Sequence, residues 1–325
     1  MKPKIFVTRK IPQAGLDMLA DRFELEVFPH DRTATKGEIM QGIKGKNGLL
    51  CLLTDNISAD MMDAAPGLKV IANYAVGFNN IDVAAATQRN IAVTNTPGVL
   101  TETTADLAFA LLMSAARRIV ESDKFTRAGK FEGWAPLLYL GQDIYQKTLG
   151  IVGFGRIGQA MAKRASGFDM KVLYYTAHRR PEAEEEKHGV EYRALDDLLR
   201  ESDFISLHVP LVAGTRHLIG QREFNLMKSN AILINTARGP VIDEKALVEA
   251  LKTGKIAGAG LDVFEQEPQI EPGLLQLDNV TIAPHIGSAS VATRTRMAIM
   301  TAENIIAVLD GRTPPNLVNT EIAKK

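Results

Sequence analysis

The sequence has a single cysteine, a single tryptophan and no excess of charge of either sign. One cysteine, Cys51, excludes an internal disulfide framework and a structural zinc site built from cysteines. The 38 Lys and Arg residues balance 38 Asp and Glu residues, so the formal net charge is zero. A balanced chain has no electrostatic basis for binding nucleic acid or an anionic membrane surface. The N-terminal stretch from Met1 to Thr8 lacks the long apolar run of a signal peptide or membrane span, so we expect a cytoplasmic protein.

The composition is otherwise that of an ordinary globular protein. Hydrophobic residues make up 46% of the 325 residues and charged residues 23%. This balance provides enough apolar mass for a core and excludes disorder of the whole chain. At roughly 100 to 200 residues per domain, the length predicts two domains.

Strand and helix signals alternate along most of the chain. Strand-like runs in the first hundred residues lie at 4–8, 23–28, 48–53, 68–75 and 91–95. The alternation stops at residues 101–128, which are predicted to form one long helix, and resumes from residue 148 to about residue 283. A last helix is predicted at 289–309. This pattern predicts an α/β fold with two doubly wound parallel-sheet domains. The predicted division is 1–100 plus 286–325 for one domain and 101–285 for the other.

A glycine-rich loop opens the second series of strands. Gly153, Gly155 and Gly158 form a G-x-G-x-x-G pattern between a predicted strand and a predicted helix. The first glycine permits a tight turn, the second lets the backbone approach a pyrophosphate, and the third allows close packing of the helix. The N-terminus of that helix would add free N–H groups and positive potential. The loop therefore predicts a dinucleotide site.

The end of the next strand has no acidic residue, although an NAD site commonly has one about 20 residues after the loop. Thr176, His178, Arg179 and Arg180 occupy this stretch instead. Hydroxyl, imidazole and guanidinium groups suit a 2′-phosphate through charge-assisted hydrogen bonds, so NADPH is the first expectation. The alternative is that the two arginines merely begin a solvated loop.

Three further motifs follow predicted strands, at the sheet edge where open α/β folds bind ligands. They are I-N-T-A-R-G at 234–239, G-L-D-V-F-E-Q-E-P at 260–268 and A-P-H-I-G-S at 283–288. With N-Y-A-V-G-F-N-N-I-D at 73–82 and P-P-N-L-V-N at 314–319, they make nearly the whole chain resemble the D-isomer-specific 2-hydroxyacid dehydrogenases. Within that family, the chain looks most like the glyoxylate/hydroxypyruvate reductases.

The resemblance implies a fold, a reaction and a catalytic triad. The fold would be a Rossmann cofactor domain inserted in a flavodoxin-like substrate domain, and the assembly a homodimer. The reaction would be NAD(P)H-dependent reduction of a small 2-keto acid, such as glyoxylate or hydroxypyruvate, to the D-2-hydroxy acid. Arg238 would hold the substrate, His285 would be the general acid and base, and Glu267 would stand beside His285. Glu265 is close enough in sequence to compete with Glu267 for that role.

The implied triad is chemically consistent. A guanidinium fork matches a carboxylate. A carboxylate beside an imidazole favours the charged imidazolium and fixes its orientation. The imidazolium would then protonate the carbonyl oxygen as hydride reaches the adjacent carbon.

The resemblance also implies further contacts. Val76 and Gly77 would present backbone N–H groups to the substrate carboxylate, Leu53 would line the same pocket, and Trp134 would reach the partner subunit's substrate site. Simpler interpretations are a strand-ending turn for Val76 and Gly77, a loop anchor for Trp134 and a turn cap for Asp262. No metal ligand is expected. The implied cofactor-binding residues are Thr104, Gly153, Gly155, Arg156, Ile157, Gly158, Thr176, His178, Arg179, Val209, Pro210, Thr236, Ala237, Arg238, Asp262, His285 and Gly287.

Two questions stay open at the level of sequence. Many NADPH-linked relatives carry an arginine where this chain has Ala177 or His178, so use of NADH is an alternative. The second question is the function itself. Sibling dehydrogenases act on bulkier 2-keto acids, formate or phosphite, so another substrate is an alternative. Corepressors on the same scaffold bind peptides in response to nicotinamide redox state, so a nucleotide-sensing binding protein is a further alternative.

Overall fold

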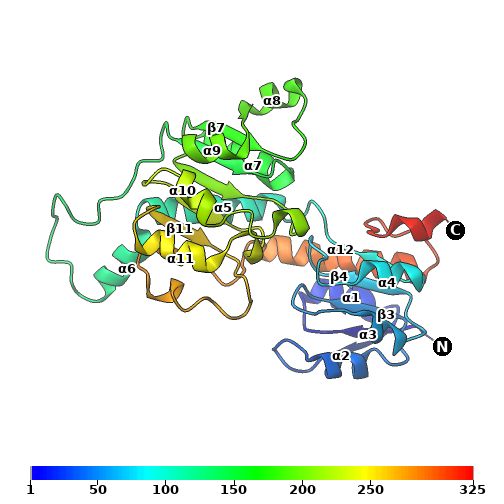
Figure 1. The fold of residues 1–325 in the computed structure, drawn as a ribbon. Helices are drawn as coiled ribbons and strands as arrows, with labels where there is room; N and C mark the ends of the chain where they lie inside the picture. The colour runs from blue at the N-terminus through cyan, green and yellow to red at the C-terminus, as the bar shows by residue number, and fades with distance from the viewer. Residues whose placement is uncertain (1, 325) are drawn as a thin grey trace. The chain divides into compact units, whose positions relative to one another are not determined.

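The computed structural model of the protein describes residues 2–324, and its ribbon is drawn in Figure 1. The chain divides into two units. The split unit combines the chain up to Leu100 with the chain from Ser288 onward, and the central unit is Thr101–Gly287. Each unit is built around one parallel sheet, which confirms the predicted α/β class.

The split unit has a five-stranded sheet in the order β2-β1-β3-β4-β5. This is a doubly wound order whose reversal point lies between β1 and β3. The strands are β1 (Lys4–Val7), β2 (Glu24–Val27), β3 (Gly48–Cys51), β4 (Val70–Asn73) and β5 (Ala92–Thr94). The helices are α1 (Gln13–Ala20), α2 (Lys36–Gly42), α3 (Ala59–Asp63), α4 (Val83–Gln88) and α12 (Val291–Leu309), with a 3₁₀ turn at Thr320–Lys324.

Helix α12 completes the core of the split unit. It packs against α1 and β4, although nearly 200 residues separate it from the rest of the unit, and Figure 1 shows it beside α1. Met297, Ala298 and Ile305 are buried on it. The strands β3 and β4 are buried at every position, as expected of parallel strands covered on both faces.

The central unit has a seven-stranded sheet in the order β12-β11-β10-β9-β6-β7-β8. Counted within the unit, this is the Rossmann order 3-2-1-4-5-6 with a seventh strand added. The strands are β6 (Thr148–Val152), β7 (Lys171–Tyr175), β8 (Val190–Tyr192), β9 (Phe204–Leu207), β10 (Ile232–Asn235), β11 (Gly258–Leu261) and β12 (Val280–Ile282). The helices are α5 (Thr101–Ala116), α6 (Ile119–Arg127), α7 (Arg156–Ser166), α8 (Glu182–His188), α9 (Leu195–Glu201), α10 (Gln221–Leu226) and α11 (Glu244–Lys252), with 3₁₀ turns at Ala213–Thr215, Gly239–Val241 and Leu274–Gln276.

The prediction of one long helix over residues 101–128 is wrong. Helix α5 ends at Ala116, and Arg118 adopts a left-handed conformation with φ of 54° before α6 begins. The carbonyl of Ala116 accepts a hydrogen bond from the N–H of Gln142 instead of continuing the helix. The buried side chains of this stretch lie in α5, and α6 has no buried residue.

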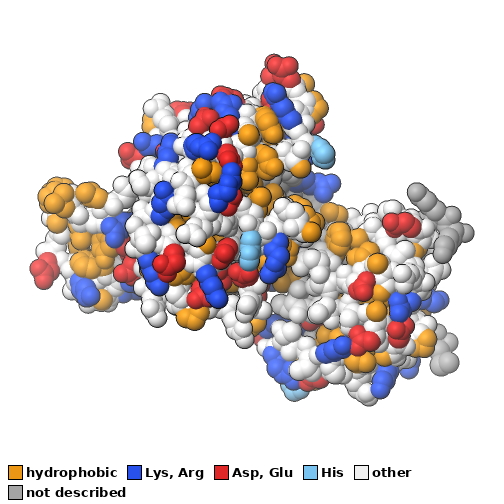
Figure 2. Space-filling model, in the orientation of Figure 1, with side chains coloured by type: hydrophobic (Ala, Val, Ile, Leu, Met, Phe, Trp, Pro, Cys, Tyr) orange, Lys and Arg blue, Asp and Glu red, His pale blue; other side chains and the backbone are white. Residues whose placement is uncertain are grey.

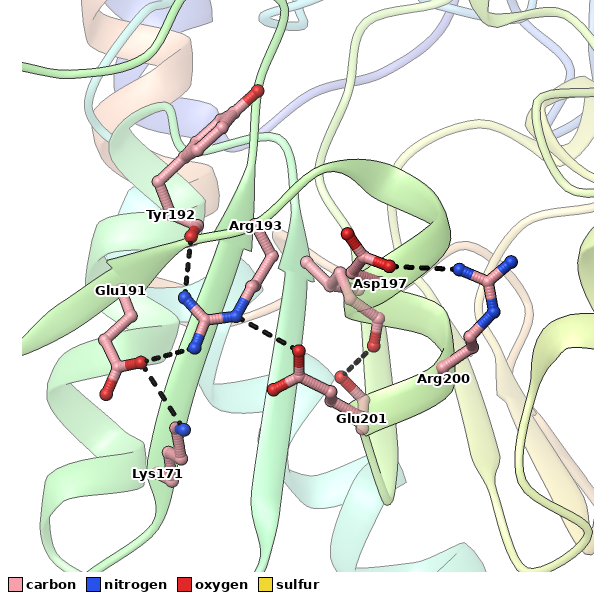
Figure 3. Close-up of polar contacts among 9 residues, drawn as sticks. Lys171, Glu191, Tyr192, Arg193, Asp197, Arg200 and Glu201 are labelled. Atoms are coloured by element: carbon pink, nitrogen blue, oxygen red, sulfur yellow. Dashed lines mark hydrogen bonds and ion pairs between the residues drawn. The ribbon is translucent and has the colours of Figure 1, made fainter.

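Ion pairs join neighbouring elements at the β8 edge of the central sheet, as Figure 3 shows. Arg193 bonds to Glu191 on β8 and to Glu201 on α9, while Lys171 on β7 also pairs with Glu191. These bridges connect two strands and a helix, so they form a network instead of isolated pairs. None of the helices within residues 2–324 combines the length and apolar character needed to span a membrane.

Candidate active site

Three strand ends of the central unit carry the predicted triad. Arg238 follows β10, Glu267 lies in the loop after β11, and His285 follows β12. Adjacent parallel strands place their carboxyl ends at one edge of the sheet, so three motifs far apart in sequence lie at the same edge.

His285 and Glu267 form a direct pair. The Nδ1 atom of His285 lies 2.8 Å from Oε2 of Glu267, and the two side chains are 24% and 27% exposed. Burial acts to raise the pKa of Glu267, but its hydrogen bond to His285, the charge of that ring, the N–H of Phe264 and the charge of Arg238 together hold the pKa below 4.5. Glu267 therefore contacts Nδ1 and not Nε2, which is the other ring nitrogen of His285 able to carry a proton.

The geometry distinguishes Glu267 from Glu265. Glu265 turns toward His217, whose Nε2 lies 2.6 Å from its Oε1. The backbone N–H of Glu265 donates to the buried carboxylate of Glu244, while the N–H of Glu244 donates back to Glu265. Glu265 therefore anchors its loop to the start of α11, and Glu267 is the glutamate that contacts His285.

Asn235 and Gly239 fix the turn that carries Arg238. The amide of Asn235 donates to the carbonyl of Arg238 and accepts from the N–H of Ala237. A Cβ atom on Gly239 would lie 1.9 Å from the carbonyl carbon of Phe264, so only glycine lets the arginine turn pack on the loop that leads to Glu267. Burial lowers the pKa of Arg238 from its ordinary value, opposed by the charge of Glu267.

Asp262 organises the backbone around His285. The N–H of His285 donates to its carbonyl, and its two carboxylate oxygens accept from the N–H groups of Ile286 and Gly287 at 2.7 and 2.8 Å. His285 itself is left-handed, with φ of 54°, a conformation uncommon for a non-glycine residue. Burial raises the pKa of Asp262, opposed by these N–H groups and by the charge of His285.

The glycine loop fits a dinucleotide phosphate. Gly153 has φ of 100°, and a Cβ there would lie 2.6 Å from the backbone of His208. Gly155 precedes α7, and a Cβ there would meet no atom within 4 Å, which leaves open space at the helix N-terminus. Arg156, Ile157 and Gly158 form the first turn of α7. Exposed N–H groups at a helix start, beside an unfilled space, suit a pyrophosphate.

The side chains expected to contact the ribose lie after β7, and one of them is held by an ion pair that the sequence does not indicate. Thr176, Ala177 and His178 follow β7 and are at least partly exposed. Arg179 donates to both oxygens of Glu185 at 2.8 Å, and Arg179 and Tyr174 together lower the pKa of Glu185 to about 2. Helix α8 therefore supplies an acidic residue to this region, but it pairs with Arg179.

Arg180 lies against the glycine loop. Its Nη2 donates to the carbonyl of Phe154 at 3.2 Å, and its buried Nε has no hydrogen-bond partner within residues 2–324. The buried hydroxyl of Thr236 likewise has none within that range. Such unpaired buried groups fit a ligand that would satisfy them.

The remaining predicted cofactor residues lie at the same edge of the central sheet or beside it. Val209 and Pro210 follow β9, the strand next to β6 at the reversal of strand order. A Cβ on Gly287 would lie 3.2 Å from Asp262 and 3.5 Å from Thr104, so these three residues are close together. Nε2 of His208 and the hydroxyl of Ser206 form a hydrogen bond. Burial lowers the pKa of His208 to about 4.

In the split unit, the predicted substrate residues lie in two turns. Leu53 follows β3, and Val76 and Gly77 come shortly after β4. These strands are neighbours in the sheet, so the two turns lie at one sheet edge. Leu53, Val76 and Gly77 are all partly exposed.

Trp134 belongs to a segment of the central unit with little burial. Its side chain is 86% exposed, and Phe131, Leu137 and Leu140 are 58%, 79% and 62% exposed. Figure 1 shows α6 and the following segment extending away from the rest of the unit, and Figure 2 shows apolar side chains gathered there. A tryptophan that anchored its own loop would be covered.

Sequence reasoning missed several residues that organise the site. Asn235, Glu244 and Gly239 are not among the residues predicted from sequence, although Asn235 and Gly239 belong to the motif at 234–239. A glycine directly after the arginine was an available signal for close backbone contact. Glu244 has no such signal, because its role depends on a loop that returns from residue 265.

Comparison with known proteins identifies the family. The sequence model described as D-isomer specific 2-hydroxyacid dehydrogenase, NAD binding domain, matches residues 109–287. A glyoxylate reductase of Korarchaeum cryptofilum is 57% identical over 100% of this chain and 98% of its own length. A glyoxylate reductase of Thermococcus litoralis is 55% identical over 99% of this chain and 98% of its own.

A solved structure agrees with these sequence matches. It is the NADPH-dependent glyoxylate/hydroxypyruvate reductase of Sinorhizobium meliloti in complex with NADP and malonate. It superimposes with a TM-score of 0.86 at 34% identity, over 98% of this chain and 97% of that one. The chain therefore belongs to the D-isomer-specific 2-hydroxyacid dehydrogenase family.

Proposed function

We propose that this protein is an NAD(P)H-dependent reductase of glyoxylate and hydroxypyruvate. The observation that carries the proposal is the His285–Glu267 pair, which lies with Arg238 at the carboxyl edge of the same sheet that bears the dinucleotide loop. The relatives named glyoxylate reductase share more than half of its residues over their full length. A corepressor would need no such proton-transfer pair.

Each residue of the triad has a separate task. Bound NAD(P)H would supply the hydride to the carbonyl carbon. His285 would give the proton from Nε2 to the carbonyl oxygen, because Nδ1 is held by Glu267. Arg238 would hold the carboxylate of the 2-keto acid, and the product would be the 2-hydroxy acid. We propose the central unit as the cofactor domain and the split unit as the substrate domain, with Leu53 and the N–H groups of Val76 and Gly77 contacting the substrate.

The proposal is tested by steady-state kinetics. Purified protein is mixed with NADPH or NADH and with glyoxylate, hydroxypyruvate or pyruvate, and the absorbance of the reduced nicotinamide is followed. We expect turnover of glyoxylate and hydroxypyruvate with at least one cofactor. Absence of turnover with every 2-keto acid and both cofactors would reject the proposal.

We propose NADPH as the preferred cofactor, with Thr176, His178 and Arg179 at the 2′-phosphate and Arg180 beside the glycine loop. The salt bridge to Glu185 uses Nε and Nη2 of Arg179. Arg179 would therefore contact the 2′-phosphate mainly through the guanidinium N–H groups that are not in this bridge. We expect Arg179→Gln and Arg180→Gln each to raise the KM for NADPH roughly tenfold while changing the KM for NADH little. Equal effects on both cofactors would contradict a role in phosphate recognition.

We propose that a second copy of this chain covers the exposed apolar segment around Trp134. A large exposed apolar patch is typical of a protein–protein contact, and this one lies on a projecting segment. Light scattering after gel filtration should give the mass of a dimer, and Trp134→Glu combined with Leu137→Glu should shift it toward the monomer. A monomeric unmodified chain would reject the proposal. The cytoplasmic location stays a prediction.

A further inference from the structure

The carboxyl edge of the split unit's sheet holds three asparagines that the proposed chemistry leaves without a task. Asn73 is the last residue of β4 and is 1% exposed. Asn95 directly follows β5, and Asn80 lies in the turn after β4. Buried amides are costly unless their donors and acceptors are paired, so their partners indicate what they hold in place.

Two of these amides bind consecutive backbone carbonyls. The Nδ2 of Asn95 donates to the carbonyl of Val76 at 2.7 Å. The Nδ2 of Asn73 donates to the carbonyl of Gly77 at 2.8 Å. These two bonds fix the peptide groups on both sides of Gly77. Glycine has the widest conformational freedom of any residue, so this position has the most to gain from such bonds.

These side chains extend the hydrogen bonding of the sheet past its last strand residue. The N–H of Thr96 donates to the carbonyl of Ala75 at 2.9 Å, so three carbonyls in a row, from Ala75 to Gly77, are held by donors. In a trans peptide the N–H points opposite to the carbonyl. The N–H groups of Val76, Gly77 and Phe78 therefore point away from these donors, and they donate to no backbone carbonyl within residues 2–324.

Asn80 joins this turn to the neighbouring one. Its Nδ2 donates to the carbonyls of Leu52 and Asp55, each at 3.0 Å. The buried carboxylate of Asp55 in turn accepts from the N–H of Leu52 and from the hydroxyl of Thr8. The Nδ2 of Asn73 also donates to Asn80 at 3.1 Å. These polar side chains form one connected hydrogen-bond network. The network holds the turn after β3, which lies at the reversal of strand order, and the turn after β4 beside it.

We propose that Asn73 and Asn95 are positioning residues, which orient the backbone N–H groups of residues 76–78 toward the carboxylate of the 2-keto acid. The inference rests on the proposed function, because it names how one side of that substrate is recognised. Successive N–H groups with fixed directions form a concave anion site without any charged side chain. Asparagine suits the task, since aspartate at the same place has no N–H to donate.

The test compares Asn95→Ala and Asn73→Ala with Asn47→Ala. Asn47 lies at the amino edge of the same sheet, where it accepts from the N–H of Lys4. We expect Asn95→Ala to raise the KM for glyoxylate and the inhibition constant of oxalate about tenfold, with the KM for NADPH unchanged. Asn47→Ala should lower the melting temperature and leave all three constants unchanged.

The isosteric variant Asn95→Asp separates positioning from packing. It keeps the shape but loses the donor, so it should match Asn95→Ala in KM, whereas Asn95→Gln should recover part of the affinity. Because Asn73 is buried and its variants risk misfolding, the half-buried Asn95 decides the outcome. Folded Asn95 variants whose KM for glyoxylate stays within twofold of the unmodified protein would overturn the inference.

Failure of the proposed function would be recognised separately. If the unmodified chain reduces no 2-keto acid, calorimetry of oxalate binding to the NADP-loaded chain still tests the anion site. If Asn95→Ala weakens oxalate binding about tenfold, the inference is supported even though the proposed function has failed. Unchanged binding, or no binding to either protein, would overturn it.

Discussion

Nδ1 of His285 lies 2.8 Å from Oε2 of Glu267, although 18 residues separate them and they follow different strands. In the proposed mechanism, this contact orients the imidazole and leaves proton transfer to Nε2. We expect His285→Ala to lower kcat between 10²- and 10⁴-fold with little change in the Kd for NADPH, because the proposed role of the ring is to move a proton and not to hold the cofactor's phosphates. Fluorescence titration of NADPH and stopped-flow absorbance measure the two quantities.

Glu267→Gln and Glu265→Gln are a matched pair for the same hypothesis. The first removes the charge that lies against His285, so kcat should fall roughly 10²-fold. The second weakens a contact with His217 and α11, so it should change kcat by less than about threefold while lowering stability. A larger kcat loss in Glu265→Gln than in Glu267→Gln would reverse the assignment.

Arg238→Ala and Arg238→Lys test the guanidinium itself. We expect Arg238→Ala to raise the KM for glyoxylate and to lower kcat, because a carboxylate and a polarised carbonyl oxygen both lose a donor. Lysine retains the charge without the planar fork, so it should recover only a part of kcat/KM. Full activity in Arg238→Lys would show that charge alone is sufficient.

Gly239→Ala tests whether the turn that carries Arg238 depends on its contact with the loop that leads to Glu267. The new Cβ would lie 1.9 Å from the carbonyl of Phe264, so the backbone must move, and kcat/KM should fall about 10²-fold. The control is Gly37→Ala in α2, where a Cβ meets nothing within 4 Å. That variant should gain roughly 0.5–1 kcal/mol of unfolding free energy from helix propensity. Activity and urea denaturation separate the two effects.

His208 predicts a loss of stability in acid. Burial lowers its pKa from 6.5 to about 4, so the unfolded chain binds a proton between these pH values and the folded chain does not. The stabilisation relative to a non-titrating residue is therefore complete above pH 6.5 and is lost as the pH falls toward 4, by up to about 3 kcal/mol. Urea denaturation from pH 7 to 4 measures it, and His208→Gln should remove this part of the pH dependence. A parallel dependence in both proteins would contradict it.

The ion pairs at the β8 edge predict a temperature-dependent contribution. Arg193 connects Glu191 and Glu201, and exposed pairs of this kind gain importance as temperature rises. Arg193→Met should lower the melting temperature by roughly 1–2 °C at low salt. High salt should reduce this difference, because screening weakens the pairs in the unmodified protein. A loss that is independent of salt would indicate packing of the alkyl chain instead.

Much of the fold could be predicted because its signals are local. Buried parallel strands are apolar throughout, and the glycine loop stands between a strand and a helix. The break after Ala116 has no glycine or proline to mark it, since Arg118 supplies the left-handed residue. Strand β8 carries a weak local signal, because only one of its three residues is buried.

The sequence identifies motifs that lie together at one edge of the central sheet, but not the partners of their side chains. Glu265 and Glu267 are indistinguishable until the loop's path sends one toward His217 and the other toward His285. Arg179 resembles a phosphate ligand in sequence, whereas its pairing with Glu185 depends on how α8 returns to β7. Contacts of this kind are decided by tertiary structure, which local pattern does not contain.

The return of α12 to the split unit has a consequence for synthesis on the ribosome. The central unit is one continuous stretch, so it can reach its native topology as soon as Gly287 has left the exit tunnel. The first hundred residues emerge earlier, but the core they form with Met297, Ala298 and Ile305 is complete only after α12 is made. The segment synthesised first must therefore wait, with apolar surface uncovered, until nearly the whole chain has been translated.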